Sequence, residues 1–138
     1  MAPVITRTHV EWLGEERFAG GVPNAPVAFM DGNGAAAPSP VVTLLNAAAS
    51  CAATDVVIIL QKKRVGLKKL TVSVEAHRRE EVPRRVLAMA LVWHLAGEGL
   101  DETKARHAIE LSVEKYCSVM SSLAPDIKIT NELRVGGA

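Results

Sequence analysis

The stretch PSPVVTLLNAAASCAATDVVIILQKKR, residues 38–64, decides the fold because it is a long apolar segment with helix signals at both ends. Ser39 and Pro40 suit the N-cap and the first helical position. The basic residues at the other end complement the helix macrodipole, and Gly66 follows them. We therefore predict a helix that runs from Pro40 through Leu60, ends near Gly66 and is the most buried helix of the chain.

The same segment is long enough to raise the question of a membrane span. It contains Asn46 and Asp55 and is rich in alanine, so its hydrophobicity is weak for insertion. The N-terminal residues MAPVITRTHVEW lack the basic region and apolar run of a signal peptide. We therefore expect a cytoplasmic protein without a membrane partner. In that compartment free or redox-active thiols are commoner than structural disulfides.

The composition is that of an ordinary globular domain. The chain has 138 residues, of which 49% are apolar and 22% are charged, and we predict one domain over residues 1–138. A net charge of +1 and an aromatic content of 4% give no electrostatic or stacking surface for nucleic acid. Function must therefore be argued from particular residues.

Alternation of apolar and polar residues predicts the other elements. Short alternating segments and turn residues predict a small β-meander that ends at about Asp31. LTVSVEAH (70–77) alternates cleanly, whereas RRVLAMALVWHLAG (84–97) is predicted as a strand with a helix as the alternative, because both its faces are rather apolar. Asp101 caps an amphipathic helix, and DIKITNELRV (126–135) closes the chain as a strand. This order predicts an α+β fold in which the long helix lies on an antiparallel or mixed sheet.

The two cysteines are the residues with the clearest chemical potential. Cys51 and Cys117 each lie on a predicted helix, and the sequence contains no CxxC, HxH or HExxH pattern, so we expect neither a metal nor a cofactor. The thiolate is the reactive form of cysteine. Cys51 lies about three turns into its helix, beyond the reach of the helix dipole, and needs a cation from elsewhere. Arg17, Arg84 and Arg85 are candidates, and periodicity alone leaves inert packing and chemistry equally open.

Longer motifs favour a chemical role for the two cysteines over inert packing. Residues 38–64 resemble the first active-site helix of the OsmC/Ohr family of thiol peroxidases, in the branch that reads Cys, small residues, Asp-Val-Val and a basic KKR ending. ARHAIELSVEKYCSVMSSL (105–123) resembles the helix that carries the second cysteine of that family. VEWLGEERFAG (10–20), followed by FMDG (29–32), looks like its N-terminal strands. The resemblance covers essentially the whole chain, and its two cysteine motifs stand in order at a compatible separation.

The resemblance implies an intertwined OsmC-like homodimer with active sites at the subunit interface. It implies that Cys51 attacks an organic hydroperoxide and becomes a sulfenic acid, which Cys117 resolves as a disulfide. A dithiol reductant then restores both thiols by exchange. Arg17 is the best match for the catalytic arginine. The implied function is defence against oxidative stress by a peroxidase that needs no cofactor.

One departure from the family pattern leads to a second hypothesis about function. The family places a glutamate just after the proline that opens the helix, where it holds the catalytic arginine, but here Val41 and Val42 follow Pro40. Glu15, Glu16 or an acid from the partner chain are the alternatives for that role. The alternative function is a non-catalytic OsmC-like dimer that binds a small apolar ligand or senses redox state.

Overall fold

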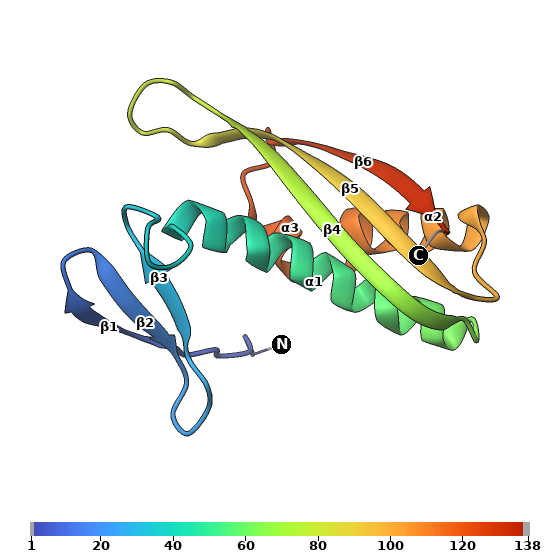
Figure 1. Ribbon diagram of the computed structural model, residues 1–138, viewed down its shortest axis with the longest axis horizontal. Coiled ribbons are helices and arrows are strands. Elements are labelled where there is room, and N and C mark those ends of the chain that lie inside the picture. Colours follow the sequence, from blue (N-terminus) through green and yellow to red (C-terminus); the bar gives the residue numbers. More distant parts are fainter. Residues whose placement is uncertain (1, 137–138) are drawn as a thin grey trace. The chain divides into compact units, whose positions relative to one another are not determined.

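In the computed structural model, which describes residues 2–136, the chain begins with a three-stranded antiparallel sheet (Figure 1). Its strands, in the order β1-β2-β3, are β1 (His9–Gly14), β2 (Arg17–Gly21) and β3 (Ala28–Asp31). The predicted meander and its end at Asp31 are confirmed. Asp31 then shapes the following turn, since its side chain accepts hydrogen bonds from the backbone N–H groups of Asn33 and Ala36.

The long helix α1 spans Pro40–Lys62, as its end signals predict. Ser39 caps it by accepting a hydrogen bond from the N–H of Val42 at 3.2 Å. The chain leaves the helix at Arg64, whose positive φ of 60° lets the N–H of Val65 reach a carbonyl of the last turn. The buried residues of α1 are Ala48, Ala49, Ala52, Val56 and Leu60.

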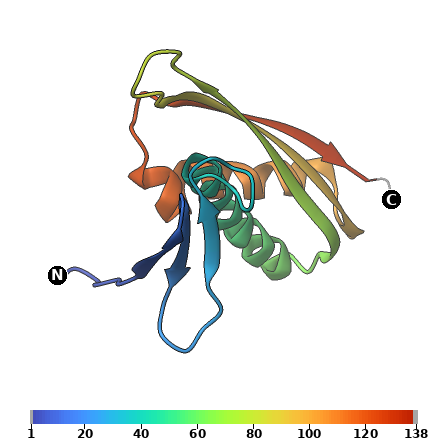
Figure 2. The same ribbon diagram turned by 60° about the vertical axis from the view of Figure 1, so that its left-hand side comes forward.

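The expectation that α1 is the most buried helix is only partly correct, because one face of it is exposed in the single chain. Leu44 and Ile58, which share this face, are each more than 40% exposed. By length and composition alone α1 could cross a membrane. Its buried face, however, is turned toward the sheet that follows it in the chain, as in the core helix of a globular fold (Figure 1, Figure 2).

The second sheet contains β4 (Gly66–Arg78), β5 (Val86–Glu98) and β6 (Lys128–Val135). β4 and β5 are antiparallel, whereas β5 and β6 are parallel, so the predicted mixed sheet is confirmed. The segment with two apolar faces is the central strand β5, which rules out its helical alternative. Its core face is Met89, Leu91, Trp93 and Leu95, whereas Leu87, which continues the same alternation, is 40% exposed beside a register shift near the hairpin end.

The second helical segment is more irregular than predicted. Asp101 caps α2 (Glu102–Leu111) by accepting a hydrogen bond from the N–H of Lys104. A π-helical turn, η1 (Ser112–Tyr116), follows, and a short helix α3 (Ser118–Ser122) begins after Cys117. α1 and α2 lie on the same face of the β4–β5–β6 sheet (Figure 1, Figure 2).

The chain divides into two compact units, Met1–Leu44 and Leu45–Ala138. The first contains the β1–β2–β3 sheet, and the second contains most of α1 together with all later elements. The prediction of one domain over residues 1–138 stays a prediction.

Candidate functional site

Cys51 lies in the middle of α1, in a run of small residues. The surrounding alanines have high helix propensity and leave the backbone of α1 open to close approach by a neighbouring segment. Ala48 and Ala52 are fully buried on either side of Cys51, whereas Cys51 itself is only partly buried. An external reagent therefore has access to the Cys51 thiol.

Cys117 lies where the helical segment changes direction. It follows the π-helical turn in an extended conformation (φ −71°, ψ 110°) and is the N-cap of α3, where its sulfur accepts a hydrogen bond from the N–H of Met120 at 3.4 Å. The Cys117 sulfur lies 4.0 Å from the carbonyl oxygen of Ala48, one turn before Cys51. Only 1% of Cys117 is exposed. The π turn thus turns the second thiol inward toward α1.

The two thiols are neighbours. Both cysteines are free, and the Cys51 thiol lies close enough to the Cys117 thiol to affect its pKa. Burial raises the pKa of the Cys117 thiol above its ordinary value of 9.0, and the Cys51 thiol beside it adds to the rise. The N–H of Met120 opposes this rise in pKa because it stabilises the thiolate. The pair therefore combines one accessible sulfur with one buried, predominantly protonated sulfur.

A buried polar contact that the sequence analysis missed fixes the spacing of the two cysteine-bearing segments. The hydroxyl of Ser112, which is fully buried, donates to the carbonyl oxygen of Ala52 at 2.7 Å. A carboxylate oxygen of Asp55 lies 3.3 Å from the same hydroxyl. Ser112 follows Ala105, Ala108 and Ile109 at helical spacing on the apolar face, so that periodicity was the signal that could have identified it.

Arg17 begins β2 in the Met1–Leu44 unit, whereas both cysteines belong to the Leu45–Ala138 unit. Its guanidinium Nη2 lies 3.4 Å from a carboxylate oxygen of Glu15. In the register of β2 and β3, Arg17 is directly opposite Asp31. The N–H of Ala36 is the main cause that lowers the pKa of Asp31, and the charge of Arg17 adds to it, although burial acts in the opposite direction.

The surroundings of Arg17 favour one of the open alternatives for an acid that holds it. Glu15 contacts the guanidinium directly, whereas the side chain of Glu16 lies against Gly32. Arg17 also lines a small cavity of about 100 Å³ together with Phe18, Phe29 and other apolar side chains of the same unit.

The other two candidate arginines have partners within their own unit. The guanidinium of Arg85 donates two hydrogen bonds, at 2.7 and 3.0 Å, to the carboxylate of Asp126. Arg84 donates from its Nε to the carbonyl oxygen of Glu80 at 3.1 Å, within the loop between β4 and β5. Arg85 is therefore committed to an ion pair with Asp126, as Arg17 is with Glu15, and the assignment of Arg17 stays a prediction.

Comparison with known proteins identifies relatives over nearly the whole chain. Residues 32–132 match the family described as OsmC-like protein. Protein YhfA from Escherichia coli strain K12 is 38% identical over 133 residues, which cover 96% of this chain and 99% of YhfA.

Solved structures agree with that match. The crystal structure of a hypothetical protein from Aquifex aeolicus VF5 has a TM-score of 0.83 and 26% identity, and the match covers 98% of this chain and all of that protein. An organic hydroperoxide resistance protein OsmC from Legionella pneumophila has a TM-score of 0.67 at 12% identity, over 96% of this chain and all of that one. The likeness to the Legionella protein concerns the fold.

Proposed function

Since the chain belongs to the OsmC-like protein family, we propose that it reduces organic hydroperoxides with Cys51 and Cys117 as its reactive thiol pair. The observation that carries the proposal is the proximity of a partly exposed cysteine to a buried one. Two thiols that touch can form a disulfide after one of them has been oxidised, whereas two separate core cysteines cannot.

The proposed reaction proceeds in three balanced steps. The Cys51 thiolate attacks the terminal oxygen of the hydroperoxide, the O–O bond breaks, and the alcohol leaves with a proton while Cys51 becomes a sulfenic acid. The Cys117 sulfur then attacks the Cys51 sulfur, and water leaves as the disulfide forms. A dithiol reductant returns two electrons and two protons by thiol–disulfide exchange at the accessible Cys51 sulfur.

Three further assignments belong to this proposal. Arg17 supplies the positive charge that favours the Cys51 thiolate, with Glu15 as the acid that holds Arg17. The chain works as a homodimer, since apolar side chains such as Leu44 on α1 and Phe29 on β3 are exposed in the single chain. A cytoplasmic setting would keep the thiols reduced between turnovers.

A second function is favoured by one observation, the pair of valines at positions 41 and 42. They stand where the family has the glutamate that holds its catalytic arginine. Because imprecise positioning can cost orders of magnitude in rate, a chain without that acid can retain the fold and both thiols but lose turnover. It would then bind a small apolar ligand or sense redox state.

The deciding experiment follows the mass of the reduced protein under non-reducing conditions after a slight excess of peroxide is added. Cumene hydroperoxide and hydrogen peroxide are compared in separate reactions. We expect rapid loss of two hydrogens, faster with cumene hydroperoxide, because a Cys51–Cys117 disulfide forms. Cys117→Ser should stop at Cys51 with one added oxygen, and Cys51→Ser should react slowly or not at all.

The same experiment separates the two functions. If both thiols survive for hours in the wild-type protein, the peroxidase proposal is wrong and the ligand-binding or sensing function is favoured. Arg17→Gln and Arg84→Gln form a matched pair of arginine variants. A slower first step in Arg17→Gln alone supports its role, whereas equal rates in both variants refute it.

A further inference from the structure

A groove of about 660 Å³ lies in the Leu45–Ala138 unit between α1 and the α2–η1 segment. Its apolar walls are Ile58 and Ile59 from α1 and Leu111 from α2, with Tyr116 from the π turn. Neither cysteine is among the residues that line it. The volume is within the range of small-molecule sites, so the groove has room for a ligand that the thiol chemistry does not require.

The two helices that form the groove run in opposite directions. Ser112, just after α2, contacts Ala52 in the middle of α1. At the other end, Gly99, just before α2, lies beside the carbonyl group of Arg64, just after α1. Residues near the end of α1 therefore face residues near the start of α2.

This direction makes the groove electrically asymmetric. Lys62 and Lys63 line it at the end of α1, together with His107 from α2. Asp55 lines the opposite end, where its carboxylate lies beside the hydroxyl of Ser112. One end therefore attracts an anionic group and the other end repels it.

The cationic end is not neutralised by the chain itself. Within the described residues, the side chains of Lys62 and Lys63 make no hydrogen bond or ion pair. Glu98 and Glu102, the acidic side chains nearby, are paired with Lys68 at 3.3 Å and with Arg106 at 3.0 Å.

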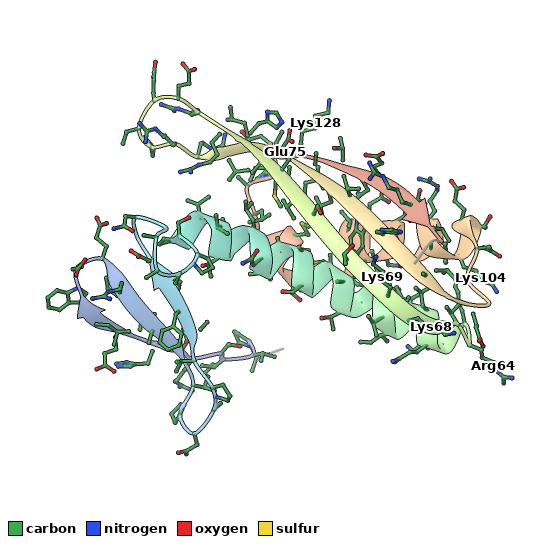
Figure 3. All side chains as sticks on the ribbon, in the orientation of Figure 1. Arg64, Lys68, Lys69, Glu75, Lys104 and Lys128 are labelled. Carbon is green, nitrogen blue, oxygen red and sulfur yellow. The ribbon has the colours of Figure 1, made fainter. Side chains whose placement is uncertain are left out.

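Further cations add to the positive potential. Arg64 and Lys104 also gather at this end of the unit (Figure 3). The carboxyl end of α1 contributes a partial charge of roughly −0.5, which is smaller than the two full positive charges of Lys62 and Lys63. The net potential at this end of the groove is therefore positive.

We infer that the groove binds an amphipathic monocarboxylate. Its carboxylate lies at Lys62 and Lys63, and its uncharged chain extends along Ile58, Ile59 and Leu111. The seven residue steps from Asp55 to Lys62 span about 10 Å along the helix, which sets the length of the apolar chain. A second anionic group at the far end would meet Asp55, so dicarboxylates are disfavoured.

The test uses Tyr116, the single tyrosine of the chain, as a probe inside the groove. The reduced full-length protein, carrying ring-labelled tyrosine, is titrated with decanoate while its tyrosine NMR signal is followed. Decanol and decyltrimethylammonium are the matched ligands with a neutral and a cationic head. We expect a saturable shift with one decanoate per chain, and binding of decanol at least about tenfold weaker.

Variants locate the carboxylate. The double variant Lys62→Gln with Lys63→Gln should bind decanoate about tenfold more weakly and decanol unchanged. Lys68→Gln is the control, because Lys68 is at the same end of the unit but is paired with Glu98 and does not line the groove. Equal affinity for decanoate and decanol would overturn the inference, as would an unmoved Tyr116 signal at about 1 mM ligand, roughly the weakest useful affinity.

A second copy of the chain is the competing occupant of the groove. Sedimentation at each protein concentration used for the titration gives the oligomeric state directly. If decanoate moves the Tyr116 signal only after the protein has been diluted to a monomer, a second copy covers the groove and the inference is wrong. No peroxide is present, so this result is independent of the peroxidase test.

Discussion

The two three-stranded sheets differ in how far their apolar side chains are buried. In the β4–β5–β6 sheet Trp93 and Leu95 are completely buried. In the β1–β2–β3 sheet Trp12 is 64% exposed and Phe29 is 57% exposed. The β4–β5–β6 sheet completes its core within its own unit, whereas the β1–β2–β3 sheet retains apolar surface that a partner can bury. Stability and association are therefore assigned to different parts of the chain.

The largest expected effect on stability comes from replacing each of the two tryptophans by alanine. Trp93→Ala should reduce the free energy of unfolding by about 3–5 kcal/mol, because it leaves a cavity in the core. It also removes the indole N–H that donates to the side chain of Asn131 at 2.8 Å. Trp12→Ala should change the unfolding free energy of the isolated chain by less than about 0.5 kcal/mol. Urea unfolding followed by circular dichroism at low protein concentration measures both.

The opposite ranking would contradict the comparison. If Trp12→Ala destabilised the isolated chain as much as Trp93→Ala does, the N-terminal sheet would be part of the same cooperative core. The indole N–H of Trp12 donates to the carbonyl oxygen of Glu15 at 2.8 Å, so Trp12→Phe is the milder variant that separates loss of this bond from loss of the ring.

We expect dimerisation, unlike stability, to depend on the exposed apolar side chains of the β1–β2–β3 sheet. The proposed homodimer is expected to sediment at twice the mass of the single chain. Phe29→Ser should weaken it by about 2 kcal/mol, which is roughly 30-fold in the dissociation constant, if this exposed ring is central to the interface. Val82→Ser is the control, because Val82 is even more exposed but lies in the loop between β4 and β5. Equal weakening by both variants would place the interface elsewhere.

Most of the fold follows from local patterns in the sequence. Ser39 and Asp101 cap the helices they were predicted to cap, because a short polar side chain before an apolar periodic run has few other roles. The alternation in residues 70–77 gave the correct face of β4, since a half-buried strand imposes a period of two. β5 was ambiguous because both its faces are apolar, and its strand state depends on pairing with β4 and β6, which are distant from one another in the sequence.

The candidate site was predicted less completely. The sequence motifs identified Cys51 and Cys117, but the geometry that brings their thiols together depends on the π turn after Leu111. A π turn inserts one residue into a helix and has no composition signal of its own, so a regular helix was predicted there. Ser112, which joins the two cysteine-bearing segments, continues the apolar periodicity of α2, and that signal was overlooked.

The contact of Ser112 should therefore matter more than its small size suggests. Ser112→Ala should cost about 1–2 kcal/mol of unfolding free energy, because it removes a buried hydrogen bond between the two segments. Ser122→Ala, whose exposed hydroxyl bonds only to its own helix, should cost less than about 0.5 kcal/mol. Urea unfolding of both variants provides the comparison, and equal costs would show that the Ser112 bond does not couple the segments.

The smallest expected effect concerns the surface pair of Arg85 and Asp126, which joins the start of β5 to the turn before β6. The hydrogen bond from Arg85 lowers the pKa of Asp126 below its ordinary value of 3.8. A lowered pKa in the folded state contributes stability that is present above pH 3.8 and is lost as the pH falls through the lowered value. Arg85→Gln should therefore lower the urea midpoint slightly at neutral pH, and the difference from the wild-type protein should vanish in strong acid. Arg134→Gln, at the longer exposed pair with Glu132, is the control. A difference for Arg85→Gln that persists unchanged below the lowered pKa would mean that Arg85 acts by packing and not by its charge.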